Sequence, residues 1–259
     1  MNLLIAILII AITVWFFTTA LRRKKTVPAV FPAAYRAVLE NDVHYYKALS
    51  PEDQRRFEAD MLVFLNSIAI EGIKTEVTDE DRVFIAASAV IPIFAFPQWK
   101  YKNLTAVLLY PDTFDETYQF EGSRRSILGM VGSGDLNGKM LLSQQALREG
   151  FMNSGDKSNT GIHEFVHLLD KSDGMTDGVP ETLLKHQYVM PWVKLMHEEI
   201  RKIMEQHSDI NPYGATNEAE FFAVVSEYFF ERPDLLQERH PALFDLLTQA
   251  FHQQPASST

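Results

Sequence analysis

Apolar residues recur at helical spacing through most of the chain that follows residue 26. The first three such stretches cover residues 33–50, 51–67 and 78–96. Ser50 directly before Pro51 is typical of a helix start, because serine caps free backbone N–H groups and proline fits the first helical position. We therefore expect three helices in this part of the chain, the third weakened near its end by Pro92 and Pro97.

Strand-like runs interrupt the helical pattern in the middle of the chain. They cover residues 104–110, 126–131 and 139–143, and prolines and glycines separate them. These runs predict a small sheet. We expect residues 139–143 to form an edge strand able to hold an extended peptide by strand addition, with an ordinary sheet strand as the alternative.

After this predicted sheet the helical pattern returns. A helix should begin at residues 159–160, after a polar loop rich in capping residues, and end near Gly174. One further helical stretch covers residues 180–206. Another is an almost wholly apolar run that starts after the capping residues 216–217. The pattern predicts a mostly helical α+β fold in a single domain, residues 26–255, with a disordered tail at 256–259.

The N-terminal segment has a different character. Residues 2–21 carry no charge and are mostly apolar, and about twenty such residues match the thickness of a bilayer core. Residues 22–25 are all basic, an order opposite to that of a cleavable signal peptide. By the positive-inside rule we expect residues 1–25 to be a single-pass anchor in the inner (cytoplasmic) membrane, with the remaining chain in the cytoplasm. A buried helix of a soluble domain is the alternative.

The composition limits the possible metal ligands and binding partners. The chain has no cysteine, which excludes disulfides, thiolate metal sites and a cysteine nucleophile, and leaves histidine and carboxylates as metal ligands. Its formal net charge is −10, without a basic stripe interleaved with aromatic residues. We therefore expect no binding to nucleic acid.

Residues 161–170 contain the motif His-Glu-x-x-His. His163 and His167 are four residues apart, so they project from one face of a helix and can share a Zn²⁺ ion. Glu164 could take the proton of a zinc-bound water, whose pKa is about 7. Two histidines can also fall four apart by accident in an ordinary amphipathic helix, so a third ligand is required.

The apolar run after residue 217 contains two candidate third ligands, Glu220 and Glu227. A carboxylate on a buried helix needs a partner, which a bound metal provides. Glu218 lies in the exposed first turn, where an acid serves the helix dipole. Asp170 could orient a ligand imidazole or be a solvated group at the helix end.

These motifs resemble the MtfA family, zinc-dependent peptidases of the gluzincin type named for titrating the repressor Mlc. The resemblance extends from the histidine motif through Tyr213 and residues 220–230 to Gln-Gln-Pro at 253–255. The block after Tyr213 also resembles the metalloprotease domain of anthrax lethal factor. The resemblance implies a zincin-like peptidase domain, Zn²⁺ as cofactor, Glu220 as the third ligand and a catalytic role for Tyr213.

We therefore expect a membrane-tethered zinc metallopeptidase that hydrolyses a peptide or protein substrate. Glu164 would act as general base, and Tyr213 would donate a hydrogen bond to the oxyanion or the leaving nitrogen. The alternative for Tyr213 is a loop tyrosine packed over the site. Two other functions remain open: a regulator that sequesters a cytoplasmic partner such as a transcriptional repressor, with peptidase activity secondary, and a membrane adaptor without metal.

Overall fold

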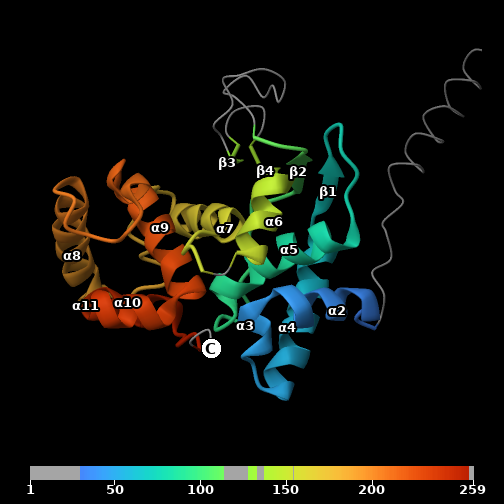
Figure 1. Cartoon of the computed structure of the whole chain (residues 1–259), viewed down its shortest axis with the longest axis horizontal. Coiled ribbons are helices and arrows are strands. Elements are labelled where there is room, and N and C mark those ends of the chain that lie inside the picture. The colour runs from blue at the N-terminus through green and yellow to red at the C-terminus, as the bar shows by residue number, and fades with distance from the viewer. Residues whose placement is uncertain (1–29, 114–127, 133–136, 154, 257–259) are drawn as a thin grey trace, which may run out of the picture. The chain divides into compact units, whose positions relative to one another are not determined.

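A computed structural model describes residues 30–113, 128–132, 137–153 and 155–256 (Figure 1). The chain divides into two units, Met1–Val30 and Phe31–Thr259. The expected membrane anchor, residues 2–21, lies outside the described residues. Within the described ranges, no helix is both long and apolar enough to span a bilayer.

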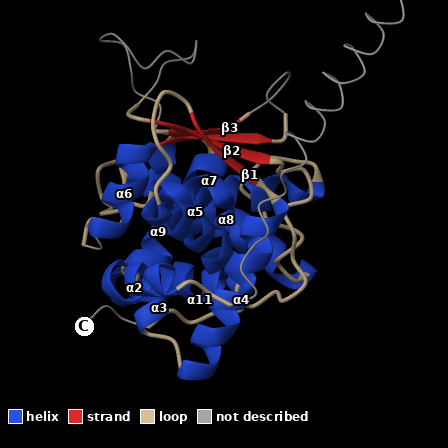
Figure 2. Ribbon diagram, turned by 90° about the vertical axis from the view of Figure 1, so that its right-hand side faces the viewer, coloured by secondary structure: helices blue, strands red, loops and turns tan. Residues whose placement is uncertain are grey.

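The second unit is mostly helical with one small sheet, which confirms the predicted α+β class (Figures 1 and 2). The helices are α2 (Ala33–Asp42), α3 (His44–Lys47), α4 (Pro51–Ser67), α5 (Asp79–Val90), α6 (Gln144–Met152), α7 (Thr160–Asp170), α8 (His186–Met204), α9 (Glu218–Glu231), α10 (Pro233–Arg239) and α11 (Pro241–Phe251). The short 3₁₀ turns are η1 (Ile91–Ile93), η3 (Lys171–Asp173) and η4 (Pro212–Ala215). The strands are β1 (Ala69–Gly72), β2 (Ala106–Tyr110), β3 (Gly129–Val131) and β4 (Lys139–Ser143).

Capping residues start the helices where the pattern predicts them. Ser50 Oγ accepts a hydrogen bond of 3.1 Å from the Asp53 amide at the start of α4. At the start of α5, Thr78 and Asp81 form a reciprocal capping box. The predicted helix over residues 33–50 is divided into α2 and α3 because Val43 is extended. The third predicted helix ends at Val90, and Pro92 lies in η1.

The strand order in the sheet is β1-β2-β4-β3. β2 pairs in parallel with β1 and β4, and β3 pairs antiparallel with β4. The expectation that residues 139–143 form the edge strand is therefore wrong, because β4 lies between β2 and β3. Strands β2 and β4 are almost completely buried, as interior parallel strands are. Among the described strands β3 is the edge on the side of β4.

The short strand β1 was not predicted. It has four residues, and most of them are exposed, so no alternation of apolar and polar positions distinguishes it from a loop. Its parallel pairing with the buried β2 is a tertiary interaction. The sheet forms a layer against one side of the helices, with α7 beneath it (Figure 2).

Helices α7 and α9 are at the centre of the core. α9 is buried from Phe221 to Glu231 without interruption. α7 packs closely on α5 at Gly161, where an added Cβ would lie 2.1 Å from Ser88 Oγ. Only glycine permits this approach, which holds the helix that carries the histidines against the rest of the core.

Candidate metal centre

Two buried helices supply the three groups that sequence analysis proposed as metal ligands. His163 and His167 project from α7, and Glu220 from the first turn of α9. Their ligand atoms form a triangle: His163 Nε2 lies 3.1 Å from His167 Nε2 and 3.0 Å from Glu220 Oε2, and the third edge is 3.3 Å. Within the described part of the chain, His163, His167 and Glu220 are the group of side chains placed closely enough to hold one metal ion together.

This triangle fits a tetrahedral ion. Zn²⁺ bonds of about 2.0–2.1 Å place neighbouring ligand atoms about 3.3–3.4 Å apart. The three observed edges, 3.0 to 3.3 Å, are close to that spacing. Three electron-pair donors at such short distances repel one another unless a proton or a cation lies between them. The donor set of two imidazoles and one carboxylate leaves a fourth position open to water.

Glu227 orients the first of these histidines. Its Oε1 lies 2.6 Å from His163 Nδ1, on the ring edge opposite the triangle. Because a carboxylate only accepts, Nδ1 carries a hydrogen, which leaves Nε2 as the nitrogen of this ring that can bind a metal ion in the triangle. The other oxygen of Glu227 accepts from the Asn159 amide at 2.6 Å and from Ser158 Oγ at 3.2 Å. Of the two candidate third ligands, Glu220 therefore joins the triangle and Glu227 supports it.

Electrostatics in the triangle favour a cation. Burial raises the pKa of Glu220, but hydrogen bonds from His163 and His167 outweigh it and lower the pKa to about 2. Burial likewise lowers the pKa of His163, but attraction to Glu227 and hydrogen bonds to Glu220 and Glu227 raise it well above its usual value. The carboxylates thus stabilise positive charge at this place, whether it is a proton or a metal ion.

Glu164 lies in the same cleft and is almost completely buried. Burial raises its pKa, and within the described structure its Oε2 has no hydrogen-bond partner. The edge strand covers it: a Cβ added at Gly129 would lie 2.6 Å from Glu164 Cγ and 2.7 Å from Oε1. The predicted strand run 126–131 contains Gly129, and glycine inside a strand pattern indicates close approach of another group, a signal that sequence analysis did not use.

Tyr213 stands at the rim of the cleft. It belongs to η4, its ring centroid is 6.0 Å from that of His163, and 53% of it is exposed. Partial burial, and then repulsion by Glu220 and Glu164, raise the pKa of its hydroxyl, which therefore stays protonated as a donor. The cleft has a volume of about 530 Å³ and is lined by residues of β3, α7, η4 and α9.

Asp170 has neither of the two roles considered in sequence analysis, since it is fully buried and bonds to a loop amide. Its Oδ2 accepts a 3.0 Å hydrogen bond from the Gly178 amide, and no hydrogen bond among the described residues joins it to either histidine. Gly178 has a positive φ of 72°, and an added Cβ would lie 2.1 Å from Glu218 O. Asp170 therefore holds the loop after α7 against the start of α9, which carries Glu220. Burial raises the pKa of Asp170 to about 6.

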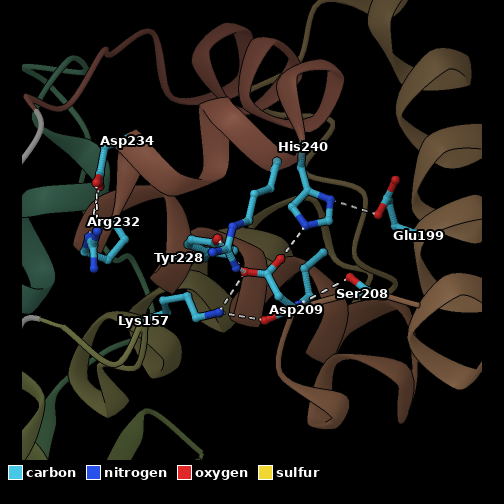
Figure 3. Close-up of polar contacts among 10 residues, drawn as sticks. Lys157, Glu199, Ser208, Asp209, Tyr228, Arg232, Asp234 and His240 are labelled. Atoms are coloured by element: carbon cyan, nitrogen blue, oxygen red, sulfur yellow. Dashed lines mark hydrogen bonds and ion pairs between the residues drawn. The ribbon is translucent and has the colours of Figure 1, made fainter. Parts of the chain in front are cut away.

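A second polar cluster joins the segment before α7 to the C-terminal helices (Figure 3). The Asp209 carboxylate is at its centre and accepts from Lys157 Nζ at 3.0 Å and Tyr228 Oη at 2.8 Å. Arg239 Nη1 and His240 Nε2 lie 2.7 Å and 2.8 Å from the same carboxylate. Lys157 is followed directly by Ser158 and Asn159, which donate hydrogen bonds to Glu227. The Asp209 cluster therefore fixes the loop that positions Glu227, the partner of His163.

The fold and the cleft together define an α+β protein with a candidate His-His-Glu metal site beside a buried glutamate. Residues 18–252 match the family of glucose-regulated metallo-peptidases, M90, so the chain belongs to this family. It is 28% identical to Mlc titration factor A of Serratia proteamaculans, covering 80% of this chain and 84% of that protein. It is 33% identical to Mlc titration factor A of Pectobacterium atrosepticum, covering 69% and 70%. An uncharacterized protein of Synechocystis is 31% identical, covering 90% and 89%. These findings confirm the family expected from the motifs.

Proposed function

We propose that this protein is a zinc-dependent peptidase with a zincin-like catalytic domain. The observation that carries the proposal is the ligand triangle of His163, His167 and Glu220 in one cleft with the buried Glu164. Membership of a metallopeptidase family supports it. A closed structural site would use four protein ligands, whereas this one offers three.

The residues around the triangle have the properties that peptide hydrolysis requires. Zn²⁺, when bound, would polarise the scissile carbonyl and lower the pKa of a water to about 7. Glu164 would accept the proton of that water and deliver it to the leaving amine, and its raised pKa suits this exchange. The Tyr213 hydroxyl would donate to the oxyanion or the leaving nitrogen. Strand β3, as a sheet edge next to Glu164, would hold the substrate backbone by strand addition.

We also propose that residues 2–21 anchor the protein in the inner membrane, with the catalytic domain, residues 26–255, facing the cytoplasm. The support is the apolar composition of residues 2–21 and the four basic residues that follow them. A reporter active only in the cytoplasm, fused after Thr259, is expected to give signal. Signal instead from a reporter that requires export would reverse the proposed orientation.

A second candidate function follows from the relatives. Several are named Mlc titration factor A, a name that describes a protein acting on Mlc. This chain could likewise bind and sequester a cytoplasmic regulator, with peptidase activity secondary. The two functions differ in their dependence on Glu164, because sequestration needs no general base.

Substitution of Glu164 by glutamine tests the peptidase. Glu164→Gln is nearly isosteric, so we expect zinc content and folding to persist while peptide cleavage falls by ~10²–10⁴-fold. As ligand controls, His163→Ala, His167→Ala and Glu220→Ala should each lose zinc, and Glu218→Ala should keep it. Cleavage at the wild-type rate by Glu164→Gln would refute the mechanism. Full zinc content in Glu220→Ala would place the third ligand elsewhere.

A further inference from the structure

A second cavity, of about 660 Å³, adjoins the metal cleft. Val131 at the end of β3 and Lys171 just after α7 line both cavities, so the two lie side by side. A volume of this order is typical of sites that accept small ligands or several side chains. Nothing in the proposed hydrolytic mechanism uses this cavity.

The wall of this cavity is apolar and aromatic. The described lining residues of this kind include Phe96, Trp99, Tyr101, Leu104, Val131 and Leu168. The indole Nε1 of Trp99 is buried and has no acceptor in the described structure. A buried N–H without an acceptor is costly.

The rim is basic. Its described cationic residues are Lys100, Lys102, Lys139 and Lys171, and the described lining includes no carboxylate. None of the four ammonium groups forms a side-chain hydrogen bond or an ion pair in the described ranges. In a chain with 34 acidic and 24 basic residues, four unpaired lysines around one apolar cavity are an unusual concentration of positive charge. We call this site the lysine-rimmed cavity.

We propose that the lysine-rimmed cavity binds a segment of the substrate in which an apolar side chain is flanked by acidic residues. The apolar wall would bury the apolar side chain, and the rim lysines would attract the acidic groups. Because Val131 and Lys171 line both cavities, one extended substrate that passes over them would reach the cavity and the metal cleft together. This inference rests on the proposed peptidase function for its substrate, but the binding step can be measured without catalysis.

The test uses full-length, zinc-loaded Glu164→Gln protein, which should bind peptides without cleaving them. Three fluorescent peptides are compared by anisotropy at low salt: one with leucine between glutamates, one with each glutamate replaced by glutamine, and one with the leucine replaced by serine. We expect the first peptide to bind about tenfold more tightly than the second, with the difference shrinking in high salt because rim charges are screened. The third should also bind more weakly than the first.

Charge-removing variants locate the binding. The double variant Lys100→Gln/Lys139→Gln should abolish the preference for glutamate over glutamine, since it removes two rim charges and keeps most of each side chain. Lys47→Gln/Lys194→Gln removes the same charge on α3 and α8 and should leave the preference unchanged. Equal affinity for the glutamate and glutamine peptides, or a preference that survives in Lys100→Gln/Lys139→Gln, would overturn the inference.

Cleavage of the same peptides by the wild-type protein separates the two proposals. If the glutamate and glutamine peptides are cleaved with equal kcat/KM and bound equally, the peptidase stands and the lysine-rimmed cavity is not its acidic subsite. If the glutamate peptide binds selectively and no peptide is cleaved, the cavity stands as a docking site and the peptidase proposal fails. Displacement of the peptide by phosphatidylserine vesicles, lost in Lys100→Gln/Lys139→Gln, would assign the lysines to a lipid surface and overturn the inference.

Discussion

At the scale of single residues, the site depends on how each histidine is held. His163 is fixed between two carboxylates, Glu220 on its Nε2 side and Glu227 on its Nδ1 side. The negative partner on Nδ1 makes Nε2 a stronger electron-pair donor. For His167 the described hydrogen-bond and ion-pair partners are only His163 and Glu220, both within the triangle. We therefore expect the metal affinity to be more sensitive to the support of His163 than to any charge near His167.

The variant Glu227→Gln tests this dependence. It keeps a hydrogen-bond acceptor for His163 Nδ1 but removes the negative charge, so zinc affinity should fall by about 10–100-fold. The measurement is a competition titration against a zinc chelator of known affinity. Glu231→Gln is the matched control, because burial raises the pKa of Glu231 to about 8 and the group is already mostly uncharged at pH 7. Wild-type affinity in Glu227→Gln would show that His163 needs no negative partner on its Nδ1 side.

At the scale of elements, the site is made where α7, α9 and β3 meet. α7 supplies the histidines and Glu164, α9 supplies Glu220, and β3 covers Glu164 through Gly129. The contact at Gly129 leaves no room for a side chain, so the position of the edge strand and that of the proposed general base are coupled. A change in β3 should therefore displace Glu164 and alter catalysis while leaving the ligand triangle in place.

Gly129→Ala tests that coupling. The added methyl group would lie 2.6 Å from Glu164 Cγ, so Glu164 or β3 must move. We expect peptidase activity to fall by about 10²-fold or more, as for a displaced general base, with zinc content unchanged. Gly155→Ala is the control, because the nearest atom to its added Cβ is 4.0 Å away. Full activity in Gly129→Ala would mean that β3 can retreat without cost to Glu164.

At the scale of the whole molecule, the Asp209 cluster links parts of the chain that are far apart in sequence (Figure 3). His240 lies between two carboxylates, with Nε2 2.8 Å from Asp209 Oδ1 and Nδ1 3.1 Å from Glu199 Oε2. The hydrogen bond to Glu199 outweighs the effect of burial and, with the bond to Asp209, raises the pKa of His240 above its ordinary 6.5. His240 therefore ties α8 to the start of α11, and its two carboxylate partners favour the charged form of the imidazole.

The raised pKa of His240 predicts a pH dependence of stability. Because its pKa is higher in the folded protein than in the unfolded chain, His240 contributes its full stabilisation below the unfolded pKa, 6.5. This contribution is lost as the pH rises through the higher pKa of the folded protein. The free energy of unfolding, measured in urea, should therefore decline between pH 6.5 and mildly alkaline pH. His240→Gln should flatten this decline, and His207→Gln, at an exposed position, should not. An equal slope in wild type and His240→Gln would exclude His240 as its source.

The sequence by itself determined the local features of this protein. Capping residues and helical spacing located the starts of α4, α5, α7 and α9, because these signals act within one helical turn. Spacing also put His163, Glu164 and His167 on one helix. The half-buried Glu220 and the buried Glu227 were both recognised, because a charge in an apolar run needs a partner.

Only the tertiary structure decided the features that depend on contacts between residues far apart in the sequence. Glu220 and Glu227 lie on the same helix, and the packing of α7 against α9 is what makes one a member of the triangle and the other the support of His163. Strand order likewise placed β4 inside the sheet and β3 at its edge, because pairing joins segments whose sequences carry no mark of their neighbours. The contact of Gly129 with Glu164 depends on that same strand order.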